Sequence, residues 1–214
     1  MRTIKKVASH IFIDGFGGMT RGLFATLIIG TMIQQIGLLI GGSTGNVIYL
    51  LGKAAAALTS AGIGVGVAVK YGESPLVTVS AAVAAMVGGY AGKITGGTFF
   101  VDGNAVLAGP GEPLGAFIAA FAGITCGHLV SGKTKVDIIV TPVITIGAGS
   151  VVGLLVGPPI SQMMTGLGSI INWATEQRPF IMGIVVSVVM GMVLTLPISS
   201  AALGIILNLS LIHI

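Results

Sequence analysis

Long apolar segments that carry almost no charge are the feature of this sequence that most restricts its fold. A helix needs roughly 20 apolar residues to cross a bilayer, and several segments approach that length: Leu23–Ile40, Val47–Val69, Leu76–Gly92, Leu114–Ser131, Ile138–Ile160 and Phe180–Leu207. Only 7% of the residues are charged, whereas a soluble domain carries about 25%. A globule with so few charges could not cover itself with hydrated side chains. We therefore expect an all-α integral membrane protein with about six transmembrane helices.

Glycine is unusually frequent, at 35 residues. Lipid provides little hydrophobic drive for helix association, so membrane helices pack through small residues that let their backbones approach. Gly149, Gly153 and Gly157 form a G-x-x-x-G-x-x-x-G ridge, and Gly62 and Gly66 repeat the spacing. We interpret both sets as helix-packing surfaces. Glycine-rich disorder is the competing interpretation, but it requires low hydrophobicity, and the mean hydropathy here is +1.05.

The basic residues predict the orientation of the chain. With a cytoplasmic N-terminus, the inner side receives Arg2, Lys5, Lys6, Arg21, Lys70, Lys133 and Lys135, and the outer side receives Lys93 and Arg178. This distribution follows the positive-inside rule. The net charge of +4 therefore reflects orientation in the bilayer, and no nucleic acid partner is expected. Residues 1–22 are predicted to form an interfacial N-terminal segment and residues 23–208 the transmembrane region.

Two segments fit this topology poorly. Gly96–Pro113 is too rich in glycine for a regular helix and too apolar for an ordinary loop, while Ser161–Pro179 is amphipathic and ends at a proline. Irregular backbone at membrane depth is tolerated only where protein or a water-filled cavity surrounds it. We therefore expect re-entrant or interfacial structure in both segments, and a substrate path beside them.

Polar side chains in these two segments are the candidates for substrate binding. One carboxylate or amide can form two hydrogen bonds at once with hydroxyl groups, as a sugar site requires. One cluster consists of Asn172, Thr175, Glu176 and Gln177, and the other of Asp102, Asn104 and Glu112. The alternative interpretation is that both clusters are simply solvated. The first would then belong to an interfacial helix end that carries Trp173 in the aromatic belt, and the second to a loop.

No catalytic, metal or cofactor site is expected from the sequence. His128 follows Cys126 by two residues, but two potential ligands do not make a metal site. A packed or interfacial histidine is the simpler interpretation, and a ligand or proton relay is the alternative. The sequence has no recognisable Ser/His/Asp triad and no zinc-ligand spacing.

The stretch Gly127–Thr134, GHLVSGKT, matches the phosphate-binding pattern G-x-x-x-x-G-K-[ST]. A phosphate loop requires a buried strand before it and a soluble helix after it, whereas both flanks here have the character of membrane helices. We therefore interpret the stretch as a helix end, with Gly132 as the C-cap and Lys133 and Lys135 facing the cytoplasm. A nucleotide-binding enzyme is not expected.

Three longer phrases form a recognisable set: HLVSGKTKVDIIVTPVITI, GLLVGPPI and INWATEQRPFIMGIVVSVVMGMVLTLPISSAALGIIL. Together with FIDGFGGMTRGLFATLIIGT near the N-terminus, they resemble the enzyme IIC membrane subunits of the bacterial phosphoenolpyruvate-dependent sugar phosphotransferase system. The resemblance runs from about Phe12 to Leu207 and is greatest to the branch that includes regulators of toxin production.

This resemblance implies a permease in the lipid of the bacterial cytoplasmic membrane. Such a permease binds a sugar and presents it to a phosphorylated enzyme IIB, so the phosphoryl chemistry comes from separate IIA and IIB partners. IIC proteins are also commonly homodimers. In several better-known IIC families the acid of a short Thr-Glu motif binds sugar hydroxyls, and Thr175–Glu176 matches that motif in a different context.

Two alternatives to a sugar permease stay open at this point. One is a membrane sensor or regulator built on the same scaffold. The other is an ion-coupled secondary transporter, because the broken helices of such transporters are also interrupted by glycine and proline.

The end of the sequence suggests a further expectation. LSLIHI, Leu209–Ile214, resembles the in-frame translation of a transposon-end adapter used in sequencing libraries. IIC subunits of this kind normally continue for several more spans. We therefore expect residues 1–208 to be part of a C-terminally truncated IIC-type domain, followed by six residues that are not native.

Overall fold

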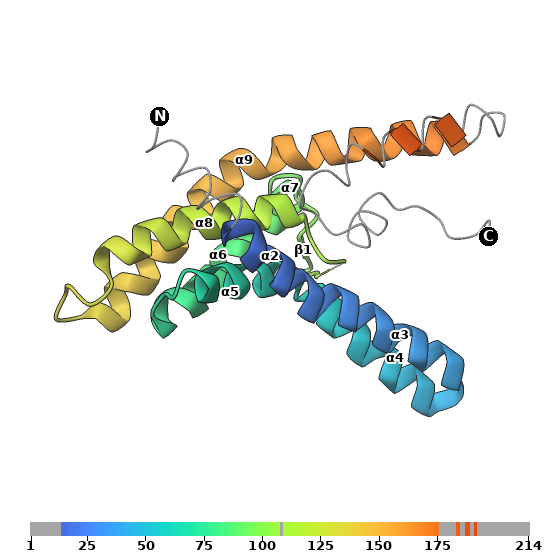
Figure 1. Cartoon of the computed structure of the whole chain (residues 1–214), viewed down its shortest axis with the longest axis horizontal. Coiled ribbons are helices and arrows are strands. Elements are labelled where there is room, and N and C mark those ends of the chain that lie inside the picture. The colour runs from blue at the N-terminus through green and yellow to red at the C-terminus, as the bar shows by residue number, and fades with distance from the viewer. Residues whose placement is uncertain (1–13, 108, 176–182, 185–186, 189–190, 192–214) are drawn as a thin grey trace.

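The structure is a computed structural model that describes residues 14–107, 109–175, 183–184, 187–188 and 191. Within these residues the chain forms helices and one two-stranded hairpin (Figure 1). The first unit consists of α2 (Phe16–Leu23), a π-helical turn η2 (Phe24–Ile28) and α3 (Ile29–Ile40). These three elements follow one another without a break, so the first apolar helix begins at Phe16, earlier than the sequence predicts.

Helix α3 packs against α4 (Gly42–Ala57) as a helical hairpin that projects from the rest of the molecule (Figure 1). We call this hairpin the α3–α4 arm. Its two backbones nearly touch, because a Cβ atom added at Gly52 would lie 2.5 Å from the carbonyl oxygen of Gly30, and one at Gly45 would lie 2.5 Å from that of Gly37. Contact of this kind is how small residues join helices in a membrane.

The chain bends by 53° between α4 and α5 (Thr59–Lys70). At the bend, the backbone N–H of Leu58 donates to the carbonyl of Ala55 at 3.2 Å, and the hydroxyl of Thr59 donates to that of Ala56 at 2.6 Å. The predicted second span is therefore interrupted in its middle.

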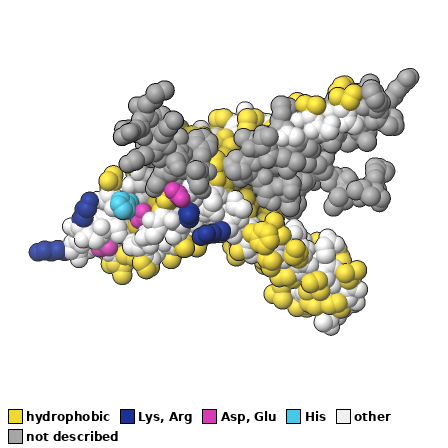
Figure 2. All heavy atoms as spheres, in the orientation of Figure 1, with side chains coloured by type: hydrophobic (Ala, Val, Ile, Leu, Met, Phe, Trp, Pro, Cys, Tyr) yellow, Lys and Arg dark blue, Asp and Glu magenta, His cyan; other side chains and the backbone are white. Residues whose placement is uncertain are grey.

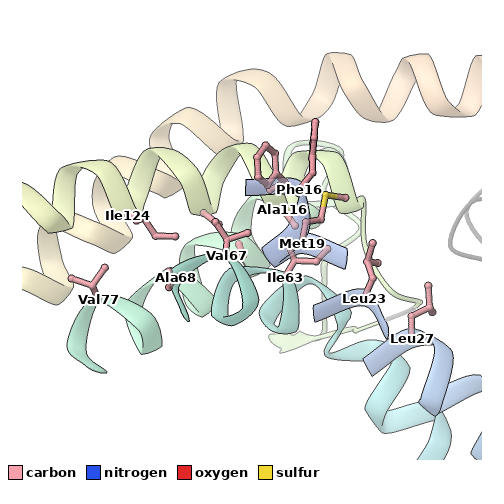
Figure 3. Packing of buried hydrophobic residues seen from close by; sticks show 14 of the residues in the cluster. Phe16, Met19, Leu23, Leu27, Ile63, Val67, Ala68, Val77, Ala116 and Ile124 are labelled. Atoms are coloured by element: carbon pink, nitrogen blue, oxygen red, sulfur yellow. The ribbon is translucent and has the colours of Figure 1, made fainter. Parts of the chain in front are cut away.

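The core lies where α2 packs on α5, and it continues to α6 (Pro75–Gly89) and α8 (Pro113–Val130) (Figure 3). A Cβ atom at Gly22 would lie 2.2 Å from the carbonyl oxygen of Gly62, which confirms the predicted packing role of the glycines in α5. The core is a cluster of buried apolar side chains that extends along these helices and includes Phe16, Met19, Leu23, Leu27, Ile63, Val67, Ala68, Val77, Ala116 and Ile124.

Between α6 and α8 lie a short helix, α7 (Ala91–Thr95), and the hairpin formed by β1 (Phe100–Val101) and β2 (Asn104–Ala105). The two strands are antiparallel, with Val101 opposite Asn104. The glycine-rich segment before α8 is thus neither a helix nor a long strand, as its composition predicts.

Helix α9 runs for 39 residues from Asp137 to Thr175. It continues through Pro158 and Pro159, so the helix extends well beyond the end of the fifth span predicted over Ile138–Ile160. Membrane helices tolerate proline because neighbouring groups satisfy the freed backbone atoms. A helix of this length measures roughly 58 Å, about twice the hydrocarbon thickness of a bilayer, so its C-terminal part extends beyond a single perpendicular crossing.

The predicted glycine ridge of α9 packs against the other helices. A Cβ atom at Gly149 would lie 2.6 Å from the carbonyl oxygen of Ala119 in α8, and one at Gly153 would lie 2.8 Å from the Cα of Gly88 in α6. The packing role predicted for this ridge is therefore confirmed.

Three helices in the described part of the chain are long and apolar enough to cross a membrane: Phe16–Ile40, Pro113–Val130 and Asp137–Ile170. The number rises to four if the bent pair α4 and α5 forms one span, and α6 is a shorter apolar helix. The predicted sixth span, Phe180–Leu207, lies almost wholly outside the described residues.

The surface separates into an apolar arm and a charged end. Hydrophobic side chains cover the α3–α4 arm, where Leu39 is 86% exposed, whereas charged side chains gather at the opposite end of the molecule (Figure 2). At that end Lys70 pairs with Asp14 at 3.4 Å. This distribution agrees with the predicted all-α membrane fold.

Candidate functional site

The end of the glycine-rich segment docks onto the bend between α4 and α5. The hydroxyl of Ser60 donates to the carbonyl of Pro110 at 2.9 Å, and the backbone N–H of Glu112 donates to the carbonyl of Gly89 at 2.6 Å. The hydroxyl of Tyr90 contacts the carbonyl of Gly109 and lies 3.2 Å from that of Ala57. We call residues 109–112 the docked loop. It joins the helix bend to the junction of α6 and α7.

Glu112 ends this loop immediately before α8. Its Oε2 atom is buried and has no hydrogen-bond partner among the described residues. Burial raises the pKa of the Glu112 carboxyl from 4.5 to about 7, because a charge is poorly solvated there. Burial therefore favours the protonated form of this side chain.

The other two members of this predicted cluster have different surroundings. Asp102 and Asn104 lie at the exposed tip of the β1–β2 hairpin, where the side-chain amide of Asn104 donates to the backbone carbonyl of Asp102 at 3.3 Å. Asp102 has φ +51° and Gly103 has φ +77°, as expected of a two-residue turn in which both central residues need positive φ. The pair therefore has a conformational role, and its part in sugar binding stays a prediction.

A cavity of about 470 Å³ lies between α7 and α9. Its lining contains the side-chain hydroxyls of Thr95, Ser161 and Thr165 and the amide of Gln162, with Gly92, Gly96 and Pro158 completing the wall. Gly92 leaves room for Ser161, because a Cβ atom at this glycine would lie 2.8 Å from the serine oxygen. We call this space the α7–α9 cavity.

The α7–α9 cavity brings together the two segments for which the sequence predicts re-entrant or interfacial structure, although residues 161–175 of the second segment form a regular part of α9. Gly96 comes from the first segment, and Ser161, Gln162 and Thr165 come from the second. None of these hydroxyl or amide side chains belongs to the predicted site. A signal for these side chains is present in the sequence after Pro158 and Pro159. Ser161 and Thr165 are four residues apart there, so a helix places both hydroxyls on one face.

The predicted cluster near the end of α9 is not tested by the structure. Asn172 and Thr175 belong to the last turn and a half of the helix, whereas Glu176 and Gln177 lie outside the described residues. Their role in sugar binding stays a prediction.

A second polar site lies at the charged end of the molecule. Nδ1 of His128, in the last turn of α8, lies 3.0 Å and 3.2 Å from the two carboxylate oxygens of Glu73, in the turn between α5 and α6. The side chain of His128 is 71% exposed and that of Glu73 only 9%. The interfacial position predicted for His128 agrees with this exposure, but its partner is 55 residues away and has no signal in the sequence.

The stretch that matches a phosphate loop connects α8 to α9. Helix α8 ends at Val130, and Gly132 follows with φ +74°, which confirms the predicted helix end. The backbone N–H of Gly132 donates to the carboxylate of Asp137 at 2.9 Å. In a phosphate loop this N–H group would donate to the bound anion. Here it donates to Asp137 instead, so the stretch does not form a phosphate-binding loop.

Comparison with known families identifies the chain. A family model described as "Phosphotransferase system, EIIC" matches residues 13–212. The chain belongs to this family. It is therefore a membrane-embedded EIIC component of a sugar phosphotransferase system, which works with IIA and IIB components. Neither a curated protein nor a solved structure matches the chain.

Proposed function

We propose that this EIIC chain binds a sugar in the α7–α9 cavity and presents it to a phosphorylated IIB partner. The observation that carries the proposal is the lining of the cavity, in which three residues with hydroxyl groups and one with an amide surround about 470 Å³ between the short helix α7 and the long apolar helix α9. Pockets for small molecules start at about 300 Å³, so a monosaccharide fits this volume.

The hydrogen-bonding state of the lining supports a polyol ligand. The hydroxyl of Thr165 already donates to the carbonyl of Ser161 at 2.8 Å, and that of Thr95 donates to the carbonyl of Ala91 at 2.9 Å. Their oxygens therefore remain as acceptors, while the amide of Gln162 offers both donors and an acceptor. Sugar hydroxyls supply the complementary groups.

The charged end supports the docking of a phosphorylated partner. Lys133 and Lys135 are exposed in the connection between α8 and α9, on the side that the positive-inside rule places in the cytoplasm. An anionic phosphoryl donor approaches such a surface favourably. Sugar entry at the α7–α9 cavity and phosphoryl transfer at the charged end would make transport and phosphorylation one process.

The test uses the full-length protein in proteoliposomes with its IIA and IIB partners and phosphoenolpyruvate. Labelled glucose, fructose, galactose and N-acetylglucosamine are supplied one at a time, and both binding and sugar phosphate are measured. Gln162→Leu is expected to weaken binding of the accepted sugar about 10-fold, since a hydrogen bond in such a site contributes about 1–1.5 kcal/mol.

Ser169→Ala is the matched control, because Ser169 lies on α9 one turn beyond Thr165 and is exposed outside the cavity lining. Unchanged affinity in Gln162→Leu would place the sugar elsewhere. A wild-type protein that phosphorylates none of the four sugars in the presence of its partners would overturn the proposed function.

A further inference from the structure

We propose that His128 is the general base that accepts the sugar hydroxyl proton during phosphoryl transfer, and that Glu73 is its positioning residue. This inference rests on the proposed function, because it requires that a sugar be phosphorylated on this chain. It assigns a chemical role to a polar pair at the end of α8, of which the sequence analysis considers His128 alone, as a packed or interfacial residue with a ligand or proton relay as the alternative.

The contact between the two side chains fixes which ring nitrogen is available. Both carboxylate oxygens of Glu73 lie within 3.2 Å of Nδ1 of His128. An ionised carboxylate can only accept hydrogen bonds, so Nδ1 carries the proton and donates it. The lone pair of Nε2 is then left free to accept a proton, which is the arrangement by which a carboxylate orients a histidine base.

His128 and Glu73 both line a second cavity. This cavity, of about 340 Å³, is lined by Tyr71, Glu73, Phe121, Ile124, Thr125, His128 and Leu129. The rings of Tyr71 and Phe121 meet edge to face, 6.1 Å apart between centroids, and the hydroxyls of Tyr71 and Thr125 add polar groups. Aromatic faces together with a carboxylate and hydroxyls suit the apolar and polar sides of a sugar ring.

The turn that carries Glu73 is held in place independently of the histidine. The hydroxyl oxygens of Ser74 and Ser131 lie 2.9 Å apart, and the backbone N–H of Glu73 donates to the carbonyl of Ala68 at 3.1 Å. The carboxylate is therefore positioned by the fold, which is the preorganisation that a positioned base requires.

The location agrees with the reaction. Glu112, at the start of α8, bonds to the α6–α7 junction, so His128, in the last turn of the same helix, lies toward the end remote from the α7–α9 cavity. This is the end predicted to be cytoplasmic, next to exposed Lys133 and Lys135. The imidazolium formed in the reaction is stabilised by the Glu73 carboxylate and by the negative end of the α8 dipole.

The proposed step balances without any further reactant. The sugar hydroxyl loses its proton to Nε2 of His128 as its oxygen forms a bond to phosphorus. The bond between phosphorus and the sulfur or nitrogen of the partner's phosphorylated side chain breaks, and the electron pair stays on that partner atom. The imidazolium then returns the proton to the released partner side chain, so the net exchange is a phosphoryl group for a proton.

The experiment compares His128→Gln with wild type in the proteoliposome assay described above, using the accepted hexose. We expect kcat for sugar phosphate formation to fall about 100-fold, the lower range for loss of a general base, with KM for the sugar changed less than threefold. His128→Ala should lose a similar amount and recover at least part of the rate when free imidazole is added. A purely structural role would give no such recovery.

Two further variants complete the test. Glu73→Gln is expected to lower kcat about 10-fold, because it keeps the side-chain shape and removes the charge that stabilises the imidazolium. Ser169→Ala, at an exposed position on α9 outside both cavities, leaves the dyad and its surroundings intact, and its kcat should stay within twofold of wild type.

The outcomes separate this inference from the proposed function. A wild-type protein that phosphorylates the sugar, together with a His128→Gln variant of equal kcat, would overturn the role of His128 and leave the permease function standing. A loss of kcat in His128→Ala without recovery in imidazole would also overturn the general base. A wild-type protein that binds or phosphorylates no sugar would overturn both.

Discussion

The hydroxyl of Ser60 donates a 2.9 Å hydrogen bond to the carbonyl of Pro110, 50 residues further along the chain. Ser60 is buried just after the bend between α4 and α5, and Pro110 belongs to the docked loop. This single bond therefore connects a broken membrane helix to the segment that leads into α8. Backbone polar groups of a loop packed against helices need such partners.

Ser60→Ala should loosen the docked loop. The variant removes the hydroxyl without introducing bulk, so the expected loss is about 1 kcal/mol in the free energy of unfolding, with more if the Pro110 carbonyl stays buried without a donor. Urea unfolding of the purified protein in detergent measures this loss. Ser169→Ala, at an exposed position on α9, should leave the stability unchanged. Equal stability of Ser60→Ala and wild type would show that the bond contributes nothing.

Glu112 predicts a dependence of stability on pH. Burial raises the pKa of its carboxyl in the folded protein from 4.5 to about 7, so protonation favours the folded state. The resulting stabilisation is complete below about pH 4.5 and is lost as the pH rises through 7. The loss between pH 5 and pH 8 should be on the order of 3 kcal/mol or less.

Glu112→Gln should flatten this pH dependence, because the amide does not ionise. Asp102→Asn is the matched control, since it removes an exposed carboxylate from the same segment and should keep the wild-type profile. Thermal unfolding in detergent at pH 5, 6, 7 and 8 tests the prediction. A wild-type profile in Glu112→Gln would assign the pH dependence to another group.

Close backbone contact predicts that Gly22 cannot be replaced even by alanine. The added Cβ atom would lie 2.2 Å from the carbonyl oxygen of Gly62, so α2 and α5 would have to separate, at a cost of about 1–3 kcal/mol for an overpacked site. Gly147→Ala is the control, because a Cβ atom at Gly147 meets no atom of the described residues within 4 Å. Yield and unfolding temperature in detergent should fall for the first variant only. Equal values for both would contradict the packing.

The helices and their packing surfaces could be predicted from the sequence because they depend on local composition. Apolar length locates the helical segments, and glycine spacing marks their contacts at Gly62, Gly149 and Gly153. The conformation of Gly132 after α8 also follows from a local rule, since a glycine with positive φ commonly ends a helix. Each of these features is set within a few residues of the chain.

The bend and the polar sites could not be predicted because they depend on distant residues. The two polar residues after Leu58 do not by themselves predict a bend in an apolar helix, and the bend is held by bonds from Ser60 and Tyr90 to the docked loop and the end of α4. The pairing of His128 with Glu73 joins two elements that are 55 residues apart. Conversely, Pro158 and Pro159 predict a helix end that the packed neighbours of α9 override.

The exposed lysines between α8 and α9 make a prediction about partner recognition. Lys133→Glu with Lys135→Glu reverses the charge of the surface proposed to meet the phosphorylated IIB protein. We expect KM for phosphorylated IIB to rise at least 10-fold, since like charges at an interface slow association and weaken the complex. Sugar binding measured without the partner should be unchanged, because the α7–α9 cavity lies on other elements.

Salt and a charge variant at another exposed position distinguish recognition from misfolding in this double variant. Rising ionic strength should increase KM for IIB in wild type and have less effect in the variant, because the attraction that salt screens is already lost. Ser43→Glu adds negative charge at the exposed turn of the α3–α4 arm, predicted to lie on the opposite side of the membrane, and should leave KM for IIB unchanged. An equal rise of KM for IIB in both variants would mean that net charge, and not this surface, governs the encounter. An unchanged KM in the double lysine variant would place the IIB contact on another part of the chain.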